Sequence, residues 1–474
     1  MAPTTSAAPS SAPNRRQMLA ALSVAAGLPL LARAAAAPRR VAIVGGGMAG
    51  VACAWLLDGR AEVLLIEGRS GLGGNVQTVD VVVDGQPLAV DIGAQFFHPG
   101  PYPTYVQLLE QLGLYPPASG GSHAFDASIT VFDAAEGQPR FVSPALPGRT
   151  WPLLAAWNKD GVEAFRVAFA AAGRREKLGV PWRQTLGEWL PTLGLSPAQW
   201  EGMILPWAAS IFSGDVEQAR SLSARAAMVF AAKALPPKPT DPTVYYVLDN
   251  GMVQVLAQMA AQFTTVQVHT GSPVVAVSRL DAGGFRVNTE GGLVAEVDDV
   301  VFASSGPQTL SLLQGVSGTE RQRQAVQAIE FFDATLMLHT DPVYAPANPR
   351  HWSFLNCQAA GGFCEASMWL APVLTPAAGA PAPNLWKSWV THRSQLPTQV
   401  LHQSSFRHLL STPATLHAQD ALRAQQGNGS VWFAGGWTLP YDSQETALTS
   451  AMSVAEGLAP GGRRGRSLRR ARSA

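Results

Sequence analysis

The pattern of apolar and polar residues predicts a strand–helix–strand unit close to residue 40. Residues 39–44 end in a short run of β-branched and small apolar side chains, residues 51–57 favour a helix, and residues 62–66 form a second apolar run. Short apolar runs bounded by glycine and polar residues are typical of strands buried on both faces. The order therefore predicts a βαβ unit, the building block of a parallel sheet.

The turn between the first strand and the helix has a glycine pattern that suits a bound pyrophosphate. Gly45, Gly47 and Gly50 give G-x-G-x-x-G, which provides a tight turn, a close approach of backbone to ligand, and close helix–strand packing. The helix N-terminus adds unpaired N–H groups and a partial positive charge. Glu67 ends the second strand at the spacing of a carboxylate that binds ribose hydroxyls. We therefore predict a dinucleotide site, with Met48 and Ala49 among its contacts.

The next segment resembles a known family. Residues 67–75, Glu-Gly-Arg-Ser-Gly-Leu-Gly-Gly-Asn, resemble the E-A-R-x-x-x-G-G-R stretch of flavin amine oxidases, protoporphyrinogen oxidases and carotenoid desaturases. The resemblance implies an FAD cofactor whose pyrophosphate lies against Arg69, Gly73, Gly74 and Asn75. Asn75 stands where the family has arginine, and residues 75–97 and 338–341 resemble an uncharacterised group of bacterial FAD oxidoreductases.

Three later segments extend this resemblance. Residues 90–97 resemble the segment beside the flavin ring, and residues 272–277 resemble the strand that holds the adenine edge. Residues 431–451 resemble the second flavin motif, whose helix N-terminus would face the N1–C2=O edge of the flavin. The contacts implied by these segments are Gly93, Ala94, Gln95, Val274, Gly435, Gly436, Glu445, Thr446 and Ala447.

The motifs divide the chain into two interleaved parts. We predict an α/β fold in which a Rossmann-like FAD-binding domain is interleaved with an α+β substrate domain. The FAD-binding domain is expected in residues 39–100, 245–310 and 428–460, and the substrate domain in residues 101–244 and 311–427. Residues 461–474 hold six arginines and no acidic residue, which predicts a basic disordered tail, with contact to an anionic surface as an alternative.

Residues 1–38 have the pattern of an export signal. Arg15 and Arg16 precede an uncharged apolar stretch, residues 18–31, and an A-x-A site at residues 32–34. The arginine pair resembles a twin-arginine signal, with an ordinary signal or an uncleaved anchor as alternatives. The sequence thus predicts cleavage near Ala34–Ala37, the twin-arginine export machinery as a partner, a periplasmic or secreted enzyme, and no transmembrane span in the mature chain.

Composition excludes several other classes of function. A formal net charge of +1 argues against a dedicated nucleic-acid-binding protein. Three cysteines exclude a disulfide scaffold, and nine scattered histidines offer no metal-binding spacing, so no metal is expected. The G-x-S-x-G turn of hydrolases is absent from the sequence.

The sequence identifies candidates for the substrate pocket but no catalytic residue. Trp389, Trp437 and Tyr441 either form an aromatic pocket at the flavin or pack in the core. His339, with a nearby aspartate, is either an acid–base group or structural. Many amine oxidases have a lysine near the flavin N5, but residues 332–337, which match that strand, contain none; the nearest lysine in sequence is Lys387.

The resemblance implies an exported FAD-dependent oxidoreductase. It would transfer a hydride from an amine or other apolar small-molecule donor to non-covalently bound flavin, with oxygen or another electron acceptor reoxidising the flavin. Two alternatives stay open: an FAD-dependent desaturase or isomerase acting on a lipophilic CH–CH substrate, and a redox-silent flavin-binding accessory protein.

Overall fold

The computed structural model describes residues 38–143, 155–179, 183–236, 241, 243–374 and 383–469. Residues 1–37, on which the predicted export signal falls, lie outside the described residues. None of the helices within the described ranges is long and apolar enough to cross a membrane.

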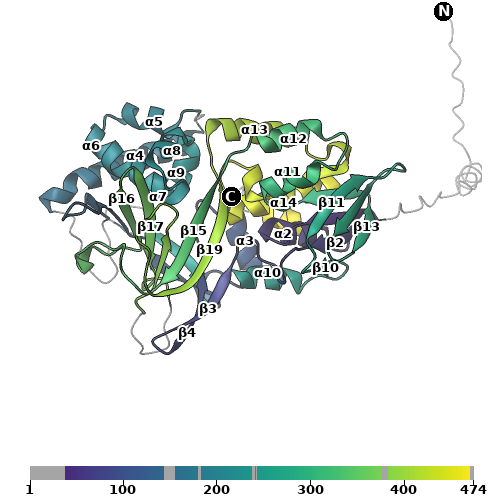
Figure 1. Cartoon of the computed structure of the whole chain (residues 1–474), viewed down its shortest axis with the longest axis horizontal. Helices are drawn as coiled ribbons and strands as arrows, with labels where there is room; N and C mark the ends of the chain where they lie inside the picture. Colours follow the sequence, from purple (N-terminus) through teal and green to yellow (C-terminus); the bar gives the residue numbers. More distant parts are fainter. Residues whose placement is uncertain are drawn as a thin grey trace, which may run out of the picture. The chain divides into compact units, whose positions relative to one another are not determined.

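The predicted βαβ unit lies at the centre of a parallel five-stranded sheet. Strand β1 pairs with β2 on one side and with β14 on the other, and the strand order is β10-β2-β1-β14-β20. Helices α2 and α14 pack against each other beside this sheet (Figure 1). The bounds are β1 Arg40–Val44, α2 Met48–Leu57, β2 Glu62–Ile66, β10 Gln267–His269, β14 Asp299–Phe302, β20 Val431–Phe433 and α14 Gln444–Leu458.

Both faces of β1 are buried, as its apolar run predicts. Val41 and Ile43 join the core that contains α2, whereas Ala42 and Val44 join a second core on the opposite face. The alternation follows from the strand, because successive side chains point to opposite faces of a sheet.

The second core differs from the predicted domain boundaries. It takes residues from three helices, α11 (Gly306–Leu313), α12 (Glu320–Gln327) and α13 (Pro413–Arg423), whose apolar faces pack with the parallel sheet. We predicted residues 311–427 as substrate domain, so this boundary is wrong for α12, for α13 and for residues 311–313 of α11. The antiparallel sheet β11 (Val274–Arg279), β12 (Phe285–Thr289) and β13 (Val294–Val297) adds to the same core.

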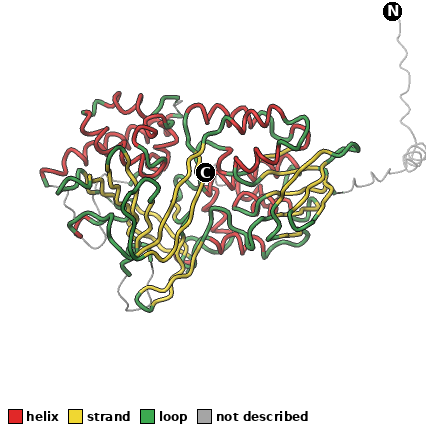
Figure 2. Tube along the Cα trace, in the orientation of Figure 1, coloured by secondary structure: helices red, strands yellow, loops and turns green. Residues whose placement is uncertain are grey.

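A mixed sheet of seven strands forms the other part of the protein, in the order β19-β15-β18-β17-β16-β7-β8. β16 and β7 are parallel and the remaining pairs are antiparallel. Helix α7 packs on β16 and β17, and Figure 2 shows the helices of residues 159–233 gathered beside these strands. The strands are β7 Ile129–Asp133, β8 Phe141–Val142, β15 Phe331–His339, β16 Leu355–Ala360, β17 Phe363–Trp369, β18 Trp386–Trp389 and β19 Val400–Leu409.

Helices and two small sheets complete the described chain. The helices are α3 Pro103–Gln111, α4 Lys159–Leu178, α5 Leu186–Trp189, α6 Pro197–Gln199, α7 Leu205–Phe212, α8 Val216–Ser221, α9 Ala224–Lys233 and α10 Val253–Ala260. The small sheets are the hairpin of β3 (Thr78–Val83) with β4 (Gln86–Asp91), and β5 (Phe96–Phe97) with β9 (Val244–Leu248) and β6 (Ser122–Asp126).

The basic C-terminal segment is ordered where the structure describes it. Residues Arg463–Arg469 form α15, in which Leu468 is fully buried. The Arg464 guanidinium lies 4.7 Å from the centre of the Trp55 ring and donates to the Trp55 carbonyl. The prediction of a disordered tail is therefore wrong for these residues, because an aromatic face and a core position hold the helix.

Candidate functional site

The first glycine turn forms where the sequence predicts it. Two of its glycines are required by the fold, whereas the third is not. Gly45 has a φ of +112°, and a Cβ there would lie 2.7 Å from the Ala303 carbonyl oxygen. A Cβ on Gly50 would lie 1.8 Å from the Gly45 oxygen, so this position must lack a side chain for the fold itself. A Cβ on Gly47 meets only an ordinary contact, 3.5 Å from the Cα of Gly74. Gly47 is thus free of fold constraints and lies at the N-terminus of α2, facing a cavity.

Glu67 fixes the loop that follows the second strand. Its Oε2 accepts a 2.6 Å hydrogen bond from the Gly46 N–H, and its Oε1 accepts from the Arg69 N–H at 2.8 Å. The Arg69 guanidinium donates to the Gly74 carbonyl at 2.9 Å. The residue types of the predicted motif therefore hold the two glycine loops together along one wall of the cavity.

The second glycine segment ends at the N-terminus of α14. The Ser443 hydroxyl caps this helix by accepting from the Thr446 N–H, and the Thr446 hydroxyl in turn accepts from the Ser443 N–H. The preceding residue, Asp442, is exposed and lines the cavity. Asp442 was not among the predicted site residues, since a loop aspartate just before a helix gives no distinctive signal.

Both glycine segments line one cavity of about 760 Å³. Fourteen of the predicted cofactor contacts line it: Gly45, Gly47, Met48, Ala49, Glu67, Arg69, Gly74, Asn75, Gly93, Ala94, Val274, Gly435, Gly436 and Ala447. The cavity runs from residues at the end of β2 and start of β11 to residues at the start of α14. The cavity wall thus brings together two glycine motifs that lie hundreds of residues apart in the sequence.

Five predicted contacts lie behind the cavity wall. Gly50 and Gly73 pack the turns, and the Gly73 N–H donates to the Gly46 carbonyl at 2.9 Å. Thr446 closes the α14 cap described above. Glu445 accepts from the N–H groups of residues 104 and 105, at 2.9 and 2.8 Å, and so caps α3. These residues shape the site from outside it, and so does Gln95.

Gln95 is held by the lysine that the sequence left unassigned. Lys387 is buried on β18 and donates to the Gln95 side chain and, at 3.1 Å, to the Asp91 carbonyl. The Asp91 carboxylate accepts from Thr78 at 2.6 Å and from the Met252 N–H at 2.9 Å. Burial lowers the pKa of Lys387 and raises the pKa of Asp91. Lys387 thus anchors the segment that carries Gly93 and Ala94 into the cavity.

The four substrate-pocket candidates separate into two pairs. Trp437 and Trp389 line the cavity, and the Trp437 indole donates to the Ser304 carbonyl at 3.0 Å. Tyr441 packs on Phe230 instead, with ring centres 5.4 Å apart. His339 is fully buried in the seven-stranded sheet, where its Nε2 lies 2.7 Å from the Ser388 hydroxyl and burial lowers its pKa to about 4. The structural interpretation therefore fits His339.

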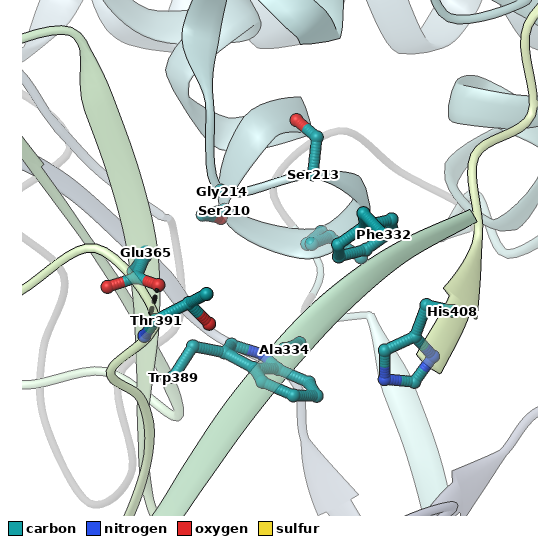
Figure 3. A pocket seen from close by; sticks show the side chains of 10 residues that line it. Ser210, Ser213, Gly214, Phe332, Ala334, Glu365, Trp389, Thr391 and His408 are labelled. Carbon is teal, nitrogen blue, oxygen red and sulfur yellow. Dashed lines mark hydrogen bonds between the residues drawn. The ribbon is translucent and has the colours of Figure 1, made fainter. Parts of the chain in front are cut away.

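A second, much smaller cavity of about 20 Å³ adjoins the large one at Trp389 and His408, which line both. It lies between β15, the end of α7 and residues of β17, and Figure 3 shows Phe332, Trp389 and His408 around it. His408 was not among the predicted site residues, because a histidine on a strand far from every motif carries no local signal. The described residues contain no group of three or more side chains able to hold a metal ion.

Together the parallel sheet, the glycine turns and the elongated cavity define a dinucleotide-binding α/β protein. The chain belongs to the flavin containing amine oxidoreductase family, whose model matches residues 48–335. It is therefore a flavin-dependent oxidoreductase of the amine oxidase type.

The solved structures that resemble this chain are less than 25% identical to it and show its fold alone. No curated protein matches the chain. A putative protoporphyrinogen oxidase from Exiguobacterium sp. 255-15 has 17% identity and a TM-score of 0.58, with 89% of this chain and 98% of that chain covered. Putrescine oxidase bound to putrescine has 16% identity and a TM-score of 0.61, over 89% and 99%. A fatty acid isomerase from P. acnes that produces CLA has 12% identity and a TM-score of 0.59, over 88% and 98%.

Proposed function

We propose that the protein binds FAD non-covalently along the large cavity and oxidises a small apolar donor. The observation that carries this proposal is that both glycine segments, through Gly45 and Gly47 and through Gly435 and Gly436, line a single cavity. A dinucleotide needs such a slot, with backbone N–H groups for the pyrophosphate and room for a flat ring at one end. FAD supplies the hydride acceptor; the protein supplies binding, orientation and electrostatics.

The residues present fit each part of FAD. The free side of Gly47 and the N-terminus of α2 suit the pyrophosphate, with Arg69 as a nearby cation. Glu67 and the backbone of Val274 lie at the adenosine end. The N-terminus of α14 suits the N1–C2=O edge of the flavin, where its dipole would favour negative charge.

The donor that we propose is an amine or another apolar molecule, held in the part of the cavity that Trp389 lines. A second candidate, desaturation or isomerisation of a CH–CH unit, is favoured by the placement of Lys387. Lys387 donates its hydrogen bonds to the Gln95 side chain and the Asp91 carbonyl, outside the large cavity. No lysine among the described residues lines that cavity. The fatty acid isomerase with the same fold supports this candidate as well.

We propose further that the enzyme is exported by the twin-arginine machinery and acts in the periplasm or outside the cell. Arg15, Arg16, the apolar stretch 18–31 and the A-x-A site support this location. That route carries folded proteins, which suits an enzyme that holds a cofactor.

The visible spectrum of the purified protein tests the proposal. We expect a flavin absorption band near about 450 nm, FAD released intact on denaturation, and anaerobic loss of the band with a donor. Amines and polyene lipids should be screened separately, with peroxide release measured in air. Colourless protein that cannot be reconstituted with FAD would overturn the cofactor assignment, and bound flavin that no donor reduces would favour the accessory-protein alternative.

A further inference from the structure

His408 lies where the large and small cavities meet. It belongs to β19, opposite Phe332 of β15, and lines both cavities together with Trp389. Its ring is packed among aromatic rings, with centres 5.3 Å from Trp389, 5.6 Å from Phe332 and 5.8 Å from Phe406. This packing fixes the orientation of the imidazole and leaves few ways to satisfy its polar atoms.

One nitrogen of His408 is left without a hydrogen bond. The Nε2 atom is buried and has no hydrogen-bond partner among the described residues. An unsatisfied buried polar atom is costly, and exceptions in folded proteins call for a specific explanation. Burial also lowers the pKa of His408 to about 4, so the ring is neutral near neutral pH and can either donate or accept one hydrogen bond at Nε2.

The acidic group of the small cavity is already neutralised. Glu365 Oε1 accepts from the N–H groups of Thr391 and His392 at 2.9 and 3.2 Å (Figure 3 shows the first), and Oε2 lies 3.4 Å from the Arg393 guanidinium. Arg393 in turn donates to the Glu365 carbonyl at 2.7 Å. Glu365 Oε2 makes no hydrogen bond among the described residues, but the Arg393 guanidinium beside it already compensates its charge. A substrate ammonium would therefore add a second cation to a pair that is neutral without it.

The size of the small cavity sets the size of the group that it can accept. About 20 Å³ is room for roughly one water-sized group. Besides His408, the polar side chains that line this space are the hydroxyls of Ser210, Ser213 and Thr391, and Glu365. The cavity can thus hold one small polar group, with the remainder of the molecule outside it, against Trp389.

We propose that His408 and the small cavity hold the single neutral polar end group of the substrate, a hydroxyl, an uncharged amine or a carbonyl, on an otherwise apolar molecule. The inference rests on the proposed function and narrows its donor to monofunctional compounds. Diamines, which carry a second cation, are poor ligands for this site. His408 acts here as a binding and specificity residue.

Binding of matched probes tests this assignment. Benzyl alcohol has the polar end group, toluene has the same ring without it, and 1,4-diaminobutane is a dication. Isothermal titration calorimetry on the full chain, with whatever flavin it retains, measures each probe without relying on activity. We expect benzyl alcohol to bind about tenfold more tightly than toluene, as one buried hydrogen bond provides, and 1,4-diaminobutane to bind more weakly than benzyl alcohol.

Two variants and a control locate the effect. His408→Phe should abolish the preference for benzyl alcohol, and His408→Gln should retain most of it. His402→Phe changes a histidine on the same strand that contacts Ser404 at 3.1 Å and belongs to neither cavity lining, and should leave the preference intact. In protein with flavin bound, benzyl alcohol should also shift the flavin visible spectrum, and His408→Phe should reduce that shift.

The outcomes distinguish this inference from the proposed function. Equal binding of benzyl alcohol and toluene to the unaltered protein, tighter binding of 1,4-diaminobutane, or an unchanged preference in His408→Phe would each overturn the assignment of His408. Protein that cannot be reconstituted with FAD, yet still prefers benzyl alcohol, would overturn the proposed function and support the pocket. Flavin-loaded protein without the preference would do the reverse.

Discussion

The Asp442 carboxylate occupies the space that a side chain at position 436 would need. A Cβ built on Gly436 lies 2.0 Å from Asp442 Oδ1. Both residues line the large cavity, next to the N-terminus of α14. The glycine at 436 and the aspartate at 442 are therefore a matched pair, in which the absence of one side chain makes room for the other.

Gly436→Ala should displace this carboxylate and disturb the end of the cavity where we propose that the flavin ring binds. We expect a loss of about 1–3 kcal/mol in stability, typical of overpacking, and weaker FAD binding. Thermal unfolding and fluorescence titration with FAD measure the two effects. Gly71→Ala is the control, because a Cβ there meets nothing within 4 Å. Unchanged affinity and unfolding temperature would show that Asp442 moves aside without consequence.

Two glycines of the first turn should fail in different ways. Gly47→Ala adds a methyl group that the fold tolerates, with its nearest neighbour at 3.5 Å, at a position on the cavity wall where we propose that the pyrophosphate binds. The flavin-free protein should keep its unfolding temperature and lose FAD retention. Gly50→Ala places a Cβ 1.8 Å from the Gly45 oxygen. It should therefore lower the stability of the flavin-free protein itself by about 1–3 kcal/mol or more.

Flavin content and thermal unfolding of the flavin-free protein separate these effects. A yellow Gly47→Ala protein with stoichiometric FAD would contradict the placement of the pyrophosphate at that turn. An unfolding temperature of flavin-free Gly50→Ala equal to that of the unaltered protein would show that the turn relaxes to accommodate the methyl group.

The sequence predicted the parallel sheet and the two glycine segments that line the cavity because their signals are local. Gly45, Gly47 and Glu67 lie within one βαβ unit, so spacing alone places them together. Arg69 and Gly74 follow on the next loop, and the family resemblance placed them at the same wall.

What the sequence could not predict depends on contacts between distant segments. Glu445 matches a flavin motif, yet its carboxylate caps α3, more than 300 residues earlier in the chain. His408 becomes part of a cavity only through the pairing of β19 with β15. Helices α12 and α13 fall in the range predicted as substrate domain, because no local pattern reveals which of two sheets an amphipathic helix covers.

Export by the twin-arginine route should depend on the arginine pair. Arg15→Lys together with Arg16→Lys preserves charge but removes the guanidinium pair on which the resemblance rests. We expect the uncleaved precursor to accumulate in the cytoplasm, as measured by cell fractionation and immunoblotting. Arg33→Lys, close to the cleavage site, is the control with the pair intact. Normal export of the double variant would indicate an ordinary signal instead.

Lys387 should make stability depend on pH in the alkaline range. Burial lowers its pKa in the folded protein below the usual value of 10.5, whereas the unfolded chain regains that value. Between the two pKa values the unfolded state binds more protons, so stability should rise as pH increases through this window, by at most about 1.4 kcal/mol per pH unit.

Lys387→Met removes the titrating group and should flatten this dependence. Thermal unfolding at about pH 7.5 and about pH 9 gives the comparison, since both lie below the usual lysine pKa of 10.5. Lys177→Met, an exposed lysine at the end of α4, should behave like the unaltered protein. Lys387→Met also removes the hydrogen-bond donor to the Gln95 side chain and the Asp91 carbonyl. FAD binding should therefore weaken as the Gly93–Ala94 segment loosens. If Lys387→Met kept the full pH dependence, Lys387 would have to be charged in the folded protein. Asp91 could not explain the remaining dependence, because its raised pKa lowers stability as pH increases, and does so at acidic pH.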